Sequence, residues 1–274
     1  MLKKILKNTT PPIIYSLIKK VIKRKKRYIP KWNVLNFEPL KGFRIYFDPT
    51  GNWQKKMIDG SYDNFLFEYI RKLDLKDKII YDIGAHIGYH SYYLSRLVGK
   101  KGTIHAFEPN PKNTERIELI LDKNPEMKNV RLHKIALSNT VGQDVFCMNT
   151  DVEGGRSSGG FIEKSDTIWD TGVFKTKGFS NIKVSTTTLD TFIKKDEQNK
   201  KPYLIKIDVE GAEFFVLQGG IEMITSYKPI ILLEIHSIKS MHDVMNFFST
   251  ISYKSEILWK EDDGRCFLKA TRLI

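Results

Sequence analysis

A glycine-containing turn holds the residues of this chain that are best placed to bind a ligand. Residues 81–89 read YDIGAHIGY and join an Ile-rich run to a helical pattern. A dinucleotide fingerprint, G-x-G-x-x-G, would need glycines at 86 and 89 after Gly84, but His86 and a tyrosine stand there. Because the second glycine of that fingerprint admits a pyrophosphate, the histidine excludes one. The pattern that remains, D-x-G-x-x-x-G from Asp82 to Gly88, favours a ligand without phosphate.

A single acidic residue follows the next apolar run. Glu108 stands in FEPNP, 24 residues beyond Gly84. This is near the spacing at which an acid at the end of a second strand binds ribose hydroxyls. Taken alone, Asp82 could cap a turn and Glu108 could be a surface acid before a helix. Together, in this order, they favour an adenosine-binding site.

Further acids and a histidine follow two later apolar runs. Asp208 and Glu210 stand in KIDVEGAE, and Glu234 and His236 stand in LLEIH. Ligands of open α/β sheets bind at the carboxyl ends of the strands, so we expect these side chains to share one pocket. The simpler interpretation is that Asp208 and Glu210 cap the turn and the helix that follow them.

Two arrangements of side chains could hold a metal ion. His86 and His90 are four residues apart, but a glycine stands between them and the helix begins inside the pair. We therefore interpret them as one turn residue and one helix residue. Asp208 with Glu234 or His236 is the better set, since oxygen ligands suit a hard cation such as Mg²⁺. We keep that set as an alternative and predict no bound metal.

The elements that must position these residues alternate along the chain. Such alternation predicts an α/β fold with a parallel sheet covered on both faces. We expect strands at 79–83, 103–107, 130–135, 203–208 and 230–235, and a final antiparallel pair at 252–259 and 265–270. We expect a hairpin within 43–59 and helices at 62–73, 89–98, 111–123, 212–225 and 240–249. Residues 148–182 are rich in glycine and lack a regular period, which indicates either a substrate-covering insertion or a plain surface loop.

Six segments resemble successive blocks of the FkbM-type methyltransferases. They cover roughly residues 60–237 and read IIYDIGAHIGYHS, TIHAFEPNP, HKIALSN, STTTLDTF, YLIKIDVEGAE and KPIILLEIH. The resemblance implies a Rossmann-like class I methyltransferase sheet of seven strands, the last antiparallel. It also implies S-adenosylmethionine as cofactor and a hydroxyl oxygen of a sugar or natural product as acceptor.

The resemblance also assigns roles to single residues. Gly84 and Gly88 would shape the methionine pocket, with Asp82 near the amino group and His86 in a place where the family often has Asn. Glu108 would hold the ribose. The adenine would lie beside Ala136 and Ser138.

For the chemical step we predict a residue that orients or deprotonates the acceptor hydroxyl. Asp208 is the first candidate. His236 is the second, because its unperturbed pKa lies near working pH, and Glu210 is the third. Asp208 and Glu210 would follow the strand next to the one that precedes the glycine turn, and His236 would follow the strand at 230–235.

The net charge of +13 comes almost entirely from the beginning of the chain. Residues 1–37 hold 11 Lys and Arg and no acid, which leaves 34 basic and 32 acidic residues, a net of +2, in the rest. We therefore predict no nucleic-acid partner. Within a basic arm over 1–40, residues 10–28 have the pattern of an amphipathic helix that lies on an anionic membrane or packs on protein, including a second subunit. It is too short and too rich in lysine to span a bilayer.

The domain that follows the arm is predicted to span 41–274. Two cysteines without a metal-binding spacing, Cys147 and Cys266, indicate a reducing compartment, so we expect a cytoplasmic protein that either stays in solution or lies on the inner face of the membrane. The predicted activity is methyl transfer from S-adenosylmethionine to a hydroxyl of a carbohydrate or glycoconjugate, such as a cell-surface polysaccharide. The alternative is a catalytically silent adenosine-binding protein that acts in assembly or membrane docking.

Overall fold

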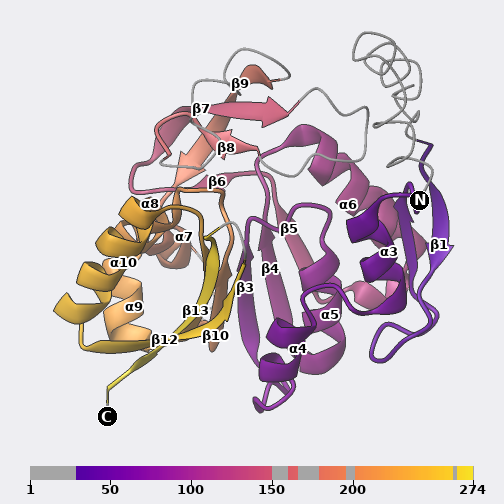
Figure 1. Ribbon diagram of the computed structural model, residues 1–274, viewed down its shortest axis with the longest axis horizontal. Helices are drawn as coiled ribbons and strands as arrows, with labels where there is room; N and C mark the ends of the chain where they lie inside the picture. Colours follow the sequence, from indigo (N-terminus) through magenta and orange to yellow (C-terminus); the bar gives the residue numbers. More distant parts are fainter. Residues whose placement is uncertain (1–28, 150–159, 166–178, 196–200, 262–263, 274) are drawn as a thin grey trace, which may run out of the picture.

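A seven-stranded sheet forms the centre of the molecule (Figure 1). The computed structural model describes residues 29–149, 160–165, 179–195, 201–261 and 264–273. The strand order is β12-β13-β11-β10-β3-β4-β5. Five strands are parallel, and β13 is antiparallel to both of its neighbours, as predicted. The strands are β3 (Ile79–Ile83), β4 (Thr103–Phe107), β5 (Val130–His133), β10 (Leu204–Ile207), β11 (Ile230–Ile235), β12 (Tyr253–Lys260) and β13 (Cys266–Arg272).

Each face of this sheet buries its own apolar core. In β3, Ile80 belongs to one core and Tyr81 to the other, because successive side chains of a strand point to opposite faces. Helices α4 (Asn64–Ile70), α5 (Tyr89–Val98) and α6 (Pro111–Lys123) contribute to the first core. The second core takes side chains from α7 (Leu189–Lys194), α8 (Glu213–Gln218), α9 (Ile221–Tyr227) and α10 (Ile238–Thr250). The predicted three-layer α/β architecture is confirmed.

The expected hairpin within 43–59 is wrong. Strand β2 (Arg44–Phe47) pairs with β1 (Lys31–Val34), which comes before it in the chain. The rest of that stretch is the helix α3 (Asn52–Asp59), which buries Met57. Strand β1 thus lies within the arm that we assigned to residues 1–40, and it pairs with a strand of the domain that we assigned to 41–274. The predicted helix at 10–28 lies outside the described residues.

The helix expected over 212–225 is broken into α8 and α9 at Gly219 and Gly220. A Cβ added to Gly219 would lie 2.1 Å from the carbonyl oxygen of Ser138. The break therefore brings the chain against a segment some 80 residues away. The Gly-Gly pair is a local signal for a break, which the predicted continuous helix did not take into account.

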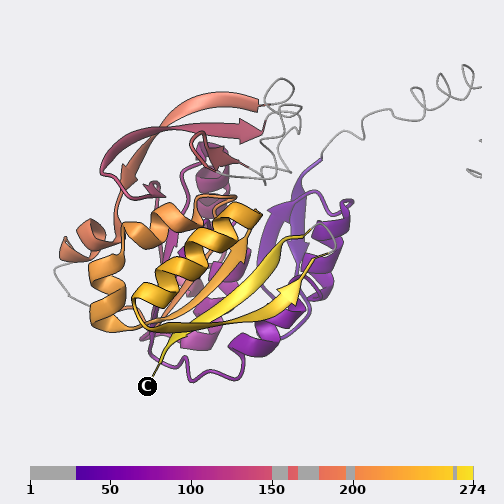
Figure 2. The same cartoon turned by 60° about the vertical axis from the view of Figure 1, so that its left-hand side comes forward.

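A second, smaller sheet covers one end of the central sheet (Figures 1 and 2). Its order is β6-β9-β7-β8, and β7 pairs antiparallel with β9 over the whole length of β7. Part of the stretch 148–182 that we expected to be irregular thus belongs to strands, while 150–159 and 166–178 lie outside the described residues. The strands are β6 (Ala136–Leu137), β7 (Gly142–Asn149), β8 (Phe161–Ile162) and β9 (Phe179–Thr187).

Among the helices that the structure describes, none is both long enough and apolar enough to cross a bilayer.

Candidate functional site

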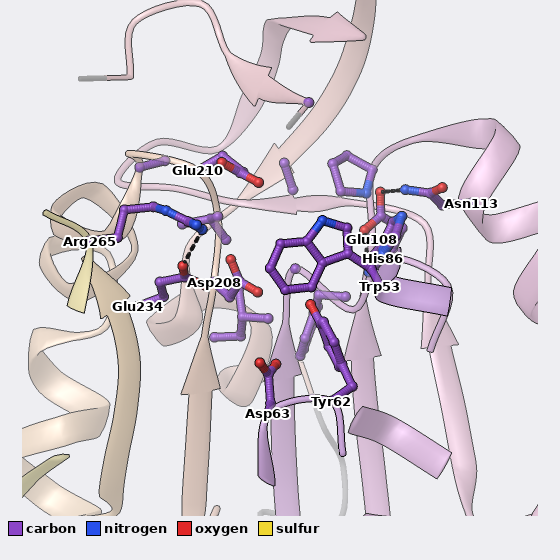
Figure 3. A pocket seen from close by; sticks show the side chains of 18 of the residues that line it. Trp53, Tyr62, Asp63, His86, Glu108, Asn113, Asp208, Glu210, Glu234 and Arg265 are labelled. Carbon is purple, nitrogen blue, oxygen red and sulfur yellow. Dashed lines mark hydrogen bonds and ion pairs between the residues drawn. The ribbon is translucent and has the colours of Figure 1, made fainter. Parts of the chain in front are cut away.

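A pocket of about 690 Å³ lies at the carboxyl ends of the central strands (Figure 3). The glycine turn after β3 and Glu108 after β4 form one part of it. Asp208, Glu210 and Glu234, from the ends of β10 and β11, form another. Ala136 and Ile162 of the small sheet also line the pocket. The structure therefore brings the two predicted groups of residues into one cavity.

The turn after β3 is held in a shape that requires glycine. Gly84 has φ +78°, and a Cβ there would lie 1.8 Å from the carbonyl oxygen of Asp208. This close approach joins the ends of β3 and β10. His86 follows with φ +53°, and burial lowers its pKa to about 3, so the imidazole is neutral. Its backbone N–H donates to Glu108 Oε2 at 2.8 Å.

Glu108 is buried and points into the ligand pocket. Its Oε1 accepts hydrogen bonds from the backbone N–H of Asn110 at 2.9 Å and from Asn113 Nδ2 at 3.1 Å. Burial raises the pKa of this carboxyl to about 7, although the hydrogen bonds from Asn110, Asn113 and His86 oppose the rise. Each carboxylate oxygen has two acceptor positions, and three of the four are occupied here, so Oε2 keeps one position for a hydroxyl donor.

The structure places Asp82 among buried partners. It is fully buried, accepts from Ser91 Oγ at 2.6 Å and forms an ion pair with Lys206 Nζ at 3.1 Å. Asp82, Gly88 and Ser138 do not line the pocket that the described residues form, whereas Ala136 does. Asp82 would therefore act on a ligand in the pocket only indirectly, through Lys206 or through the backbone of the turn.

Three acids line the other part of the pocket, and the buried His236, which does not itself line the pocket, lies beside them. His236 Nε2 lies 3.8 Å from Asp208 Oδ1, 3.4 Å from Glu210 Oε2 and 3.7 Å from Glu234 Oε1. Glu210 has φ +54°, a left-handed conformation that turns the chain back over the end of β10. The predicted catalytic residues Asp208, Glu210 and His236 are thus neighbours.

A second layer of side chains fixes His236. Its Nδ1 lies 2.8 Å from Oε1 of Glu213, a fully buried residue whose Oε2 accepts from Ser240 Oγ at 2.8 Å. Burial would lower the pKa of His236, but Glu210 and Glu213 outweigh it and raise the pKa to about 10. Without a bound ligand the imidazole is therefore protonated at neutral pH.

The carboxyl groups around His236 differ in their ionisation. Burial raises the pKa of Asp208, but Lys206 and His236 oppose it more strongly, so the net shift is downward and Asp208 is ionised. Burial and the charge of Asp208 raise the pKa of Glu234, which also forms a 2.7 Å ion pair with Arg265. Asp208 and Glu234 lie only a few ångströms apart, and their pKa values are thus shifted in opposite directions.

Aromatic side chains line the pocket opposite these acids. Trp53 of α3 is 53% exposed, and its ring packs edge-on against Tyr62 at a centroid distance of 5.8 Å. Asp63 lies beside them, and its Oδ2 is 3.0 Å from His90 Nε2. In Figure 3, Trp53 and Tyr62 stand between Glu108 and the acids of β10 and β11.

Sequence reasoning missed several residues of this pocket. Lys206 was detectable, because a lysine inside the apolar run LIKI needs a buried partner. Trp53 and Arg265 carry no such signal. They reach the pocket through the packing of α3 and of the loop before β13, which are remote in sequence from the motifs.

The strand order, the antiparallel β13 and the glycine turn after the central strand β3 define the class I methyltransferase fold. The profile of the methyltransferase FkbM domain matches residues 82–255, and this chain belongs to that family.

Two relatives extend the comparison. Hexuronic acid methyltransferase AglP of Haloferax volcanii is 27% identical over 182 residues, which are 66% of this chain and 66% of AglP. The crystal structure of methyltransferase FkbM from Methylobacillus flagellatus KT is similar with a TM-score of 0.51 and 18% identity, over 72% of this chain and 44% of that one. The match thus spans just under two thirds of the first relative and less than half of the second, and the second likeness supports the fold alone.

Proposed function

We propose that this protein transfers a methyl group from S-adenosylmethionine to a hydroxyl oxygen of a carbohydrate or glycoconjugate. The observation that carries the proposal is the single pocket, in which a nucleoside-type site around Glu108 adjoins the acids Asp208, Glu210 and Glu234, with His236 buried beside these acids. Membership in a methyltransferase family supports the reaction class.

The residues of the turn fit an adenosine-containing cofactor. Glu108 would accept the ribose hydroxyls, and Gly84 and His86 would line the methionine end. Ala136 would lie by the adenine, at the edge formed by β6. When bound, S-adenosylmethionine supplies a methyl group that is already activated. What the protein must add is alignment of the acceptor and removal of its proton.

Asp208 is the best candidate for that proton. It is ionised, its side chain is 26% exposed, and it lines the pocket. His236 carries a proton at neutral pH, so in this state it can orient Asp208 and Glu210 but cannot accept another proton. We therefore place Asp208 before His236 and Glu210 as the group that orients and deprotonates the acceptor hydroxyl.

Two features support a sugar as acceptor. AglP, to which this chain is similar, is named for its action on hexuronic acid. Trp53 and Tyr62 offer aromatic surface opposite a wall of carboxylates. Such a pocket can pack against the C–H face of a sugar ring while the carboxylates accept hydrogen bonds from its hydroxyls.

The test is a methyl-transfer assay with isotope-labelled donor. The purified full chain is incubated with a panel of surface glycans and nucleotide sugars, some containing uronic acids, and the products are identified by mass spectrometry. We expect label in a methyl ether of at least one glycan. Cofactor binding without transfer to any member of the panel would favour a catalytically silent adenosine-binding protein.

A further inference from the structure

The aromatic wall of the pocket carries an acid that the methyl-transfer proposal does not use. Asp63 lines the pocket, and its side chain is only 14% exposed. Its Oδ2 lies 3.0 Å from His90 Nε2, whereas its Oδ1 has no hydrogen-bond partner among the residues that the structure describes. In Figure 3 the carboxylate of Asp63 points into the pocket. One oxygen of this acid is therefore open to a ligand.

The local backbone does not account for the direction of this side chain. Asp63 directly precedes α4, a position at which aspartate commonly accepts a hydrogen bond from the first turn of the helix. Its side chain makes no such bond within the described structure. Its φ of +50° is left-handed, but Asp77 has φ +60° in an exposed turn, so the conformation alone carries no argument. What distinguishes Asp63 is that its carboxylate is turned away from its own helix and toward the pocket.

His90 fixes Asp63 relative to the glycine turn. His90 is buried on α5 and stands two residues after Gly88, the residue from which that helix begins. The contact between His90 and Asp63 therefore holds the carboxylate at a set place beside the element that carries the methionine end of the pocket. A group held in this way can position one part of an acceptor while another part reacts.

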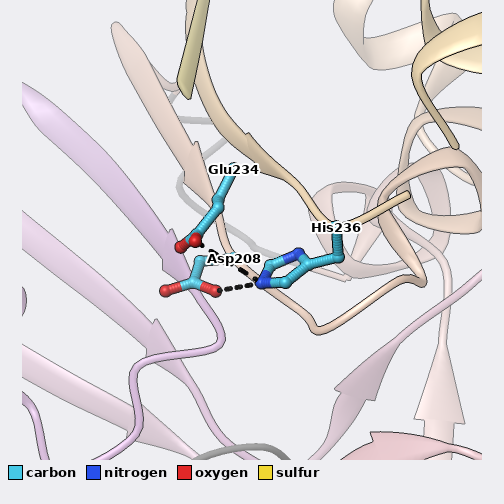
Figure 4. Close-up of side chains that lie close together, drawn as sticks. All are labelled: Asp208, Glu234 and His236. Carbon is cyan, nitrogen blue, oxygen red and sulfur yellow. Dashed lines mark ion pairs between the residues drawn. The ribbon is translucent and has the colours of Figure 1, made fainter. Parts of the chain in front are cut away.

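Tyr62 lies between this carboxylate and the predicted base. Burial raises the pKa of Tyr62, and the charges of Asp63 and Asp208 add to the rise, so its ring is within electrostatic range of both acids. Asp208 stands on the other wall of the pocket, where Glu234 and His236 lie beside it (Figure 4). A sugar ring that packs on Tyr62 could thus present one hydroxyl to Asp208 and another to Asp63.

We propose that Asp63 is a second acceptor-binding residue, whose Oδ1 accepts a hydrogen bond from a hydroxyl of the sugar other than the one that is methylated. This inference deepens the proposed function, because it concerns how the same pocket selects its acceptor. The acceptor is then a sugar ring with at least two free hydroxyls. An analogue without the second hydroxyl would leave a nearly buried carboxylate oxygen unpaired, which is the usual basis of strong discrimination against such analogues.

The test measures binding without methyl transfer. Calorimetry gives the affinity of the full chain, in the presence of excess S-adenosylhomocysteine, for each glycan and nucleotide sugar of the methyl-transfer panel. For each member that binds, analogues that lack one hydroxyl at a time are measured in the same way. Loss of the hydroxyl that Asp63 contacts should weaken binding to the wild type about tenfold or more.

Asp63→Gly removes the carboxylate, and glycine adopts the left-handed conformation of this position without strain. We expect this variant to bind the parent sugar about tenfold more weakly or worse, and to bind the analogue no more weakly than the parent. Asp77→Gly makes the same change at an exposed left-handed aspartate that does not line the pocket, and it should bind as the wild type does. Its result separates the loss of the carboxylate from the general effect of a new glycine.

Circular dichroism and the affinity for S-adenosylhomocysteine check that each variant is folded. If Asp63→Gly does not fold, Asp63→Asn keeps the test decisive, because asparagine keeps the side-chain shape and also tolerates a left-handed conformation. Its neutral amide is a weaker acceptor than a carboxylate, so Asp63→Asn should also bind the parent sugar more weakly than the wild type.

Three results would overturn the inference: no member of the panel binds, the Asp63 variants keep the affinity of the wild type, or they discriminate among the analogues as the wild type does. Binding and methyl transfer are scored separately. A chain that binds a sugar through Asp63 and methylates nothing would contradict the proposed function and leave this inference standing. Methyl transfer with an unchanged KM for the acceptor in Asp63→Gly would do the reverse.

Discussion

Glu108 combines burial with three hydrogen-bond donors, and the cofactor assignment depends on it. Replacement by alanine removes the acceptor that we assign to the ribose hydroxyls. A hydrogen bond to a charged group contributes about 1.5–3 kcal/mol, so Glu108→Ala should weaken binding of S-adenosylhomocysteine by that amount in calorimetry. Unchanged affinity in a folded Glu108→Ala variant would refute the ribose assignment.

The pKa of Glu108 is raised to about 7, so we expect the affinity for the cofactor to depend on pH near neutrality. The ionised carboxylate accepts more hydrogen bonds than the acid, so affinity for the cofactor should rise as pH increases through 7. The contribution of Glu108 to the free energy of unfolding depends on pH in the opposite direction. It is fully present at a pH below about 4.5, the pKa of this carboxyl in the unfolded chain. It declines as pH rises toward 7, because the unfolded chain releases the proton first.

Calorimetry of S-adenosylhomocysteine binding between pH 6 and pH 8 measures the first effect. The same series in Glu108→Gln, which cannot titrate, should be flat. A wild-type profile as flat as that of the variant would mean that Glu108 does not control the affinity.

Asp208 is the residue at which the chemistry can be separated from binding. Asp208→Asn keeps the shape and removes the basicity, so turnover should fall by roughly 10²–10⁴-fold while cofactor affinity stays nearly unchanged. Asp243→Asn, at a partly exposed acid of α10 that does not line the pocket, is the matched control and should retain full turnover. Full activity in Asp208→Asn together with loss in His236→Ala would instead move the base to the end of β11.

At the scale of elements, the glycine turn after β3 is tightly constrained, because its backbone packs directly against the end of β10. Gly84 has φ +78° and faces the carbonyl of Asp208, whereas Gly99 has φ +72° with nothing within 4 Å of an added Cβ. Gly99 also has ψ −173°, a conformation almost confined to glycine, so Gly99→Ala should cost about 1–3 kcal/mol of unfolding free energy from the backbone alone. Gly84→Ala should cost at least about 2 kcal/mol more, because β3 and β10 must separate.

Urea unfolding of both variants measures this difference. Equal losses of stability in Gly84→Ala and Gly99→Ala would show that the contact with Asp208 can relax without cost.

The elements that the sequence predicted best are those whose burial is set by their own residues. Strands β3, β4 and β11 and helices α5 and α6 have the predicted bounds, because short apolar runs and a capped amphipathic pattern define them locally. The predictions failed where a distant segment decides the structure. β2 pairs with β1, and the break between α8 and α9 is packed against the carbonyl oxygen of Ser138.

The same distinction applies to the candidate site. Glu108, Asp208 and His236 follow recognisable strands, so sequence could group them at one edge of the sheet. The inward ion pair of Asp82 depends on Lys206 of the neighbouring strand. The positions of Trp53 and Arg265 depend on packing that involves elements at the two ends of the described fold.

At the scale of the whole molecule, the net charge of the chain is concentrated in its first 28 residues. Residues 1–28 hold ten Lys and Arg and no acid. Each basic residue near an anionic membrane surface contributes about 1 kcal/mol, so we expect the full chain to sediment with anionic vesicles and to release at high salt. A chain lacking residues 1–28 should bind these vesicles less and keep its cofactor affinity.

Neutral vesicles are the control for that experiment. Equal sedimentation of the full and shortened chains would contradict the membrane interpretation, and a change of molecular mass on shortening would identify the arm as a contact between subunits.

Strand β13 lies between β11 and β12 in the sheet, although it follows both in the chain. A ribosome delivers β12 before the strand that must separate it from β11, so β12 has no partner in this sheet until β13 has emerged. Arg265, which directly precedes β13, reaches Glu234 only at that stage. The residues on the nucleoside side of the pocket are synthesised early. Arg265, which pairs with Glu234 on the other side, is synthesised late. A nascent chain can therefore assemble a place for the methyl donor well before it completes the surroundings of the acids that would act on an acceptor.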